Sequence, residues 1–148
     1  MIRKGFDNST KFVCWIIART AFHTNNTCKD VLNKAGKEYV RNLYNFADIL
    51  HCENPDKIMN EIIEECNITN GNFIRPEKPD FNPLSKVFMR LIVDLRDEGY
   101  GDDLVDLMFE VYNNPIGIEI ENYSNCLYWQ SPECIFECYV GQSLDIMD

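Results

Sequence analysis

The chain has little positive charge. Its 148 residues include 14 Lys and Arg against 24 Asp and Glu, which gives a formal net charge of −10 and a pI of about 4.6. Binding to a nucleic-acid backbone requires clustered Lys and Arg, and so does electrostatic attachment to an anionic membrane. The composition therefore argues against nucleic acid and anionic lipid as partners, and it favours a basic or neutral amphipathic partner.

A long apolar run is also missing. No stretch approaches the ~18–20 apolar residues of a membrane-spanning helix, and the apolar run near the N-terminus is broken by Arg19 without a small-residue cleavage site after it. We therefore expect a cytoplasmic protein with no secretory signal and no transmembrane anchor. Because 45% of the residues are hydrophobic, we expect residues 1–148 to form a single domain with its own core.

Motifs for catalysis and for metal binding are absent as well. The only histidines are His23 and His51. His51 precedes Cys52, but adjacent side chains on a helix are expected to point about 100° apart, which does not suit a nucleophile and its base. Two aspartates follow the glycines at residues 99–101 and would repel a phosphate. The sequence therefore predicts no enzyme, no cofactor and no metal site.

Cysteine, in contrast, is abundant. An odd number of thiols leaves at least one free or intermolecular. In a reducing compartment we expect these residues to act mostly as small hydrophobes. The alternative is a cross-chain disulfide, and together with Trp15 and Trp129 it favours a homodimer. The seven cysteines are Cys14, Cys28, Cys52, Cys66, Cys126, Cys134 and Cys138.

Apolar residues recur at helical spacing through most of the chain, which predicts an all-α bundle. Asn54-Pro55 and Asn82-Pro83 each place an N-cap before a proline at the first helical position. A capping box at residues 27–30 predicts another helix start. The predicted helices cover about residues 9–24, 31–50, 55–66, 83 to near 99, 102 to 114 and 132–139.

The segments between and after these helices are less regular. Three prolines exclude a continuous helix across residues 67–82. Pro115 is expected to stop the helix that begins near Asp102, and Gly141 to close the last one. Residues 116–120 alternate like a short strand, although no partner strand is visible.

The helix predicted at residues 31–50 carries the most informative pattern. Its apolar stripe contains Leu32-x-x-Ala35-Gly36-x-Glu38-Tyr39, in which the glycine permits close approach of another backbone. This segment resembles the third homology motif of the Bcl-2 family of apoptosis regulators. The resemblance implies a Bcl-2-like helical bundle whose second helix forms one wall of a groove that binds an amphipathic helix. The stripe consists of Leu32, Ala35, Tyr39, Leu43, Phe46 and Leu50.

Two frames are open for the first homology motif of that family. In the family the turn of this motif is Asn-Trp-Gly-Arg, and the nearest match here is Thr69-Asn70-Gly71-Asn72, which keeps the Asn and the Gly but lacks the Trp and the Arg. That Arg pairs with an aspartate of the ligand helix, and Arg75 is the candidate replacement. In the second frame, residues 84–94 lead into residues 99–101, where a tyrosine stands in place of the Trp.

The second homology motif also has two matches. Residues 102–107 resemble it, and so do residues 132–139. We prefer the later segment because its separation from Gly36 leaves room for the family's two central helices. An unbroken apolar central helix is missing beyond residues 84–95. The short chain without an anchor most resembles a viral, pro-survival member of the family.

The resemblance implies sequestration of the homology-3 helix of a pro-death Bcl-2 protein, such as Bim, and hence inhibition of apoptosis, with host mitochondria reached through partners. Alternatively, the same side chains pack inside the bundle, and the protein is a helical adaptor or an inhibitor of host signalling with a flat interface. The predicted groove residues are Tyr39, Asn42, Leu43, Phe46, Ala47, Ile58, Ile62, Asn70 and Gly71.

Overall fold

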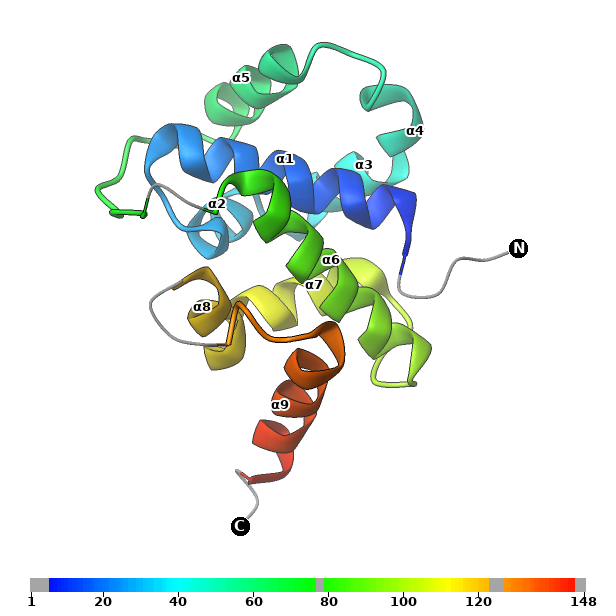
Figure 1. Ribbon diagram of the computed structural model, residues 1–148. Coiled ribbons are helices and arrows are strands. Elements are labelled where there is room, and N and C mark those ends of the chain that lie inside the picture. Colours follow the sequence, from blue (N-terminus) through cyan, green and yellow to red (C-terminus); the bar gives the residue numbers. More distant parts are fainter. Residues whose placement is uncertain (1–5, 77–78, 123–126, 146–148) are drawn as a thin grey trace.

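A computed structural model describes residues 6–76, 79–122 and 127–145, and this part of the chain contains helices and no strand (Figure 1). The all-α class predicted from the sequence is therefore confirmed. The helices are α1 (Asn8–Thr24), α2 (Cys28–Ala35), α3 (Lys37–Asn45), α4 (Ala47–Leu50), α5 (Pro55–Glu65), α6 (Phe81–Asp97), α7 (Leu104–Asn113), α8 (Pro115–Glu121) and α9 (Pro132–Asp145).

Several helix starts lie where local capping signals predict them. The Thr27 hydroxyl accepts a hydrogen bond from the Asp30 N–H at 3.1 Å and caps α2. Asn54 caps α5 in the same way, and Asp103 caps α7. These side chains satisfy backbone N–H groups that have no partner inside the helix, which fixes where each helix begins.

The stretch predicted as one helix at residues 31–50 is broken twice. It forms α2, α3 and α4, with breaks at Gly36 and Phe46. Gly36 has φ +87° and ψ 159°, a region open essentially to glycine alone. A Cβ atom there would meet nothing within 4 Å, so the expected close approach of a second backbone is wrong. The glycine serves the sharp change of direction between α2 and α3.

Three further expectations are corrected. Helix α6 begins at Phe81, with Asp80 rather than Asn82 as its cap, because the Asp80 carboxylate accepts the Phe81 N–H. Residues 116–120 lie in α8 and not in a strand. Pro115 ends α7 as expected, and it also occupies the first turn of α8, where its missing N–H costs nothing. Helix α9 continues past Gly141.

Helix α1 organises the packing. It contacts α2, α3, α4, α5 and α6, and it crosses the middle of the molecule in Figure 1. Its Ile16 and Ile17 are fully buried, as expected for a helix that is apolar around most of its circumference. Helix α6 contacts α1, α7 and α9 and forms the second layer of the core. None of the described helices is long and apolar enough to cross a membrane.

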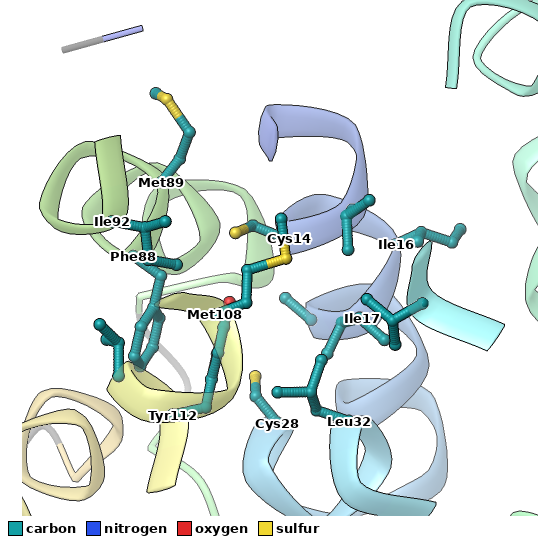
Figure 2. Packing of buried hydrophobic residues seen from close by; sticks show 14 of the residues in the cluster. Cys14, Ile16, Ile17, Cys28, Leu32, Phe88, Met89, Ile92, Met108 and Tyr112 are labelled. Carbon is teal, nitrogen blue, oxygen red and sulfur yellow. The ribbon is translucent and has the colours of Figure 1, made fainter. Parts of the chain in front are cut away.

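Some of the cysteines belong to this core. Cys14 and Cys28 lie beside Ile17, Leu32 and Tyr112 (Figure 2). Burial raises the pKa of the Cys14 thiol to about 12 and also raises that of Cys28, so both thiols are neutral. The predicted role as small hydrophobes is confirmed for these two and for the buried Cys66. Cys52 and Cys138 are exposed, Cys134 is half-buried, and Cys126 lies outside the described residues.

Candidate helix-binding surface

Four of the predicted groove residues are part of the core. Leu43 and Ala47 are buried on α3 and α4, and Ile58 and Ile62 are buried on α5. Ile62 has no exposed surface at all. In this conformation a ligand helix cannot contact these side chains unless α3 or α5 moves away from α1, the helix that both of them contact.

Two large apolar side chains beside them face solvent. Phe46, at the junction of α3 and α4, is 55% exposed, and Ile49 on α4 is 64% exposed. Asn42, one turn before Phe46, is also exposed. We call Asn42, Phe46 and Ile49 the α3–α4 surface. Ile49 was missed by the sequence analysis, although its spacing of three residues from Phe46 was a usable signal.

Tyr39, in the first half of α3, lies near the end of α5. It is half-buried, and Glu65, the last residue of α5, is close to its hydroxyl group. Burial raises the pKa of Tyr39 above its ordinary value of 10.0, and the charges of Glu65 and Glu61 raise it further. Tyr39 is thus partly covered near the end of α5, while Phe46 remains open to solvent.

Exposed acidic side chains occur on α4, in the turn after it and along α5. Helix α5 exposes Glu61, Glu64 and Glu65, and α4 exposes Asp48. Glu53, in the turn between the two helices, is exposed as well. A ligand helix that carries Lys or Arg beside its apolar anchors would complement these charges.

Asn70 and Gly71 lie at the opposite end of α1 from α4. The Gly71 N–H donates a hydrogen bond to the Thr24 carbonyl at 2.8 Å, and a Cβ atom at Gly71 would collide with Asn26. Helix α4, in contrast, shares a cavity with the first half of α1. The structure therefore does not bring Asn70 and Gly71 together with Phe46.

The Arg75 side chain is buried and paired with a carboxylate of the same protein. Its guanidinium donates a hydrogen bond to Glu121 Oε2 at 2.7 Å, and the two side chains are only 9% and 5% exposed. The guanidinium lies over the rings of Phe22 and Phe73, at 3.9 and 4.8 Å from their centroids. The expectation that Arg75 receives the ligand's aspartate is wrong, because a buried internal carboxylate already pairs with it.

A cavity of about 490 Å³ lies beside the contact between the first half of α1 and α4. The aromatic rings of Phe12 and Trp15 line one side, and Ala47 and Asp48 line the other. Ala47 is therefore the one predicted groove residue among the four buried ones that this cavity reaches. The size lies within the range of small-ligand pockets.

His51 and Cys52 are closer than adjacent helical side chains should be. The Cys52 sulfur is 3.7 Å from His51 Nε2 and 3.9 Å from Nδ1. The expected divergence is wrong because α4 ends at Leu50 and these residues lie in a turn. A sulfur almost equidistant from both nitrogens is aligned with neither lone pair, so the contact is poorly suited to proton transfer.

The described residues contain no group of three or more His, Cys, Asp or Glu side chains that could hold a metal ion. With this geometry in place, the chain was compared with protein-family models, with curated proteins and with solved structures. None of the three comparisons found a match.

Proposed function

We propose that the protein binds the homology-3 helix of a pro-death Bcl-2 protein, of the Bim type, on the α3–α4 surface and so inhibits apoptosis. The observation that carries this proposal is the exposure of Phe46 and Ile49, 55% and 64%, one helical turn apart. Large apolar side chains that are grouped and open to solvent are typical of a protein-binding surface. The resemblance of residues 32–39 to the third homology motif supplies the identity of the partner.

Two properties of the surface fit a helical ligand. An amphipathic helix presents anchors three and four residues apart, which matches the spacing of Phe46 and Ile49. The exposed Asp48, which lies between Phe46 and Ile49 in the sequence, suits a basic residue beside those anchors. Because Arg75 is buried against Glu121, the ligand's aspartate has no partner there. Binding should therefore tolerate replacement of that aspartate by alanine.

A titration with a fluorescent Bim-type peptide, followed by fluorescence polarisation, tests the proposal. Phe46→Ser and Ile49→Ser should each weaken binding about tenfold or more, since truncation of a central anchor costs about 2 kcal/mol. Ile118→Ser is the matched control, because Ile118 is a 43% exposed apolar residue on α8. It should bind like the parent protein.

Absence of binding at peptide concentrations of about 100 μM, where even a weak complex of about −5 kcal/mol would form, overturns helix capture. Equal losses in all three variants would overturn the role of the α3–α4 surface.

A second candidate function is a helical adaptor or host-signalling inhibitor that dimerises. It rests on Trp129, which lies just before α9 and is 63% exposed. Helix α9 carries Cys134 and Cys138. Light scattering with and without reductant measures the assembly state. A monomer under both conditions at high concentration would exclude the dimer, and Trp129→Ser should dissociate a dimer that uses this side chain.

A further inference from the structure

Seven of the eleven arginines and lysines that the structure describes pair with a carboxylate. Arg41 with Asp103 at 2.9 Å is one example, and Arg90 with Asp94 at 2.9 Å is another. Among the described residues, four lysines have no carboxylate within ion-pair distance. They are Lys11, Lys29, Lys34 and Lys86.

Two of these four lysines, Lys11 and Lys86, line one cavity. The cavity lies between the start of α1, the middle of α6 and the start of α9, and its volume is about 480 Å³. This is the size of a small-molecule site. Its wall includes the apolar side chains of Val87, Met89 and Ile135. The cavity therefore combines an apolar wall with two lysines in a protein whose net charge is −10.

A third positively charged side chain, Arg90, also lines this cavity. Arg90 is balanced by Asp94, and it also lies 3.6 Å from Glu133, whose side chain is 75% exposed. Lys11 and Lys86 contribute two positive charges that have no carboxylate within ion-pair distance among the described residues. A ligand with a negative charge would complement them.

We propose that this cavity binds a monoanionic amphiphile of the medium-chain carboxylate class. The carboxylate lies between the ammonium groups of Lys11 and Lys86, and the alkyl chain covers Val87, Met89 and Ile135. An anionic membrane surface is a poorer match, because such surfaces are held by clusters of basic residues and the protein is strongly acidic. The site is separate from the α3–α4 surface and does not depend on the function proposed for it.

The first experiment is calorimetric titration of the full chain with hexanoate, octanoate and decanoate below their micelle concentrations. Affinity should rise with chain length, by up to fourfold for each methylene that is buried. Decanoate should bind at one site, and 1-decanol should bind at least fivefold more weakly because it lacks the charge. Equal affinity for decanoate and 1-decanol, or for hexanoate and decanoate, overturns the proposal.

The second experiment compares two double variants with the same loss of charge. Lys11→Gln with Lys86→Gln should weaken decanoate binding about tenfold, whereas Lys29→Gln with Lys34→Gln should change it less than twofold. Lys29 is partly exposed and the other three lysines are exposed, so both variants should fold. Equal losses in the two variants would mean that only the overall charge matters, and the site would be rejected.

Two further outcomes would also reject the site. One is the absence of heat and of amide NMR shifts at Val87 up to about 1 mM decanoate, a limit that corresponds to about −4 kcal/mol. The other is binding to vesicles of anionic phospholipid without any binding of free decanoate.

Discussion

Breaking the buried pair of Arg75 and Glu121 should cost more stability than breaking an exposed ion pair among the described residues. Arg75→Met would leave the Glu121 carboxylate buried, with the Cys28 N–H, 2.8 and 3.0 Å from its two oxygens, as its remaining donor among the described residues. Removal of one partner of a buried pair costs about 3–5 kcal/mol. The loss of the guanidinium from the rings of Phe22 and Phe73 adds to this cost.

The assay is urea unfolding followed by far-UV circular dichroism. We expect Arg75→Met to lower the free energy of unfolding by about 3–4 kcal/mol, a large part of the 5–15 kcal/mol of a typical domain. The melting temperature should fall by about 10 °C. The control is Lys57→Met, which removes an exposed partner 3.8 Å from Glu53 and should cost less than about 0.5 kcal/mol.

The double variant Arg75→Met with Glu121→Gln tests the cause. It buries no charge, so it should recover at least about half of the loss caused by Arg75→Met alone. The reasoning is refuted if Arg75→Met costs no more than Lys57→Met. It is also refuted if the costs of the two single substitutions simply add in the double variant.

Two other predictions concern pH and the break between α2 and α3. The Asp106 N–H and the Arg41 guanidinium hold the pKa of Asp103 below its ordinary value of 3.8, so its stabilising effect is complete above about pH 4 and is lost as the pH falls toward the lowered pKa. Asp103→Asn keeps a capping oxygen but does not titrate, so the free energy of unfolding should fall less steeply below about pH 4 than it does in the parent protein. An unchanged pH dependence contradicts this assignment. Gly36→Ala should cost about 1–3 kcal/mol in urea unfolding because of its positive φ. Gly141→Ala, also without neighbours within 4 Å but inside α9, should be neutral or stabilising by up to about 1 kcal/mol, and an equal cost at both glycines would exclude backbone strain as the reason.

Helix starts were predictable because their signals are local. Thr27, Asn54 and Asp103 each satisfy an N–H two or three residues further along the chain. The break at Gly36 was not predictable from the apolar stripe, since steps of three and four residues continue across it. The strand predicted for residues 116–120 was wrong because it rested on their alternating apolar pattern and gave too little weight to Asn114 and Pro115, the cap and proline at the start of α8.

The candidate site was predictable only in part, for a physical reason. A core face and a groove wall show the same apolar periodicity, so the sequence cannot separate the buried Leu43 and Ile62 from the exposed Phe46. The pairing of Arg75 with Glu121 joins residues 46 positions apart. No spacing rule finds such a contact, because it exists only after the connector has packed against α1 and α8.

The placement of α1 has a consequence for biosynthesis. During translation this helix is made first among those described, yet the partner that covers much of it, α6, begins only at Phe81. Until α6 has left the ribosome, Ile16 and Ile17 of the nascent chain lack the α6 side chains that help to bury α1. Partly made chains of this kind are the species most prone to aggregate and most attractive to chaperones.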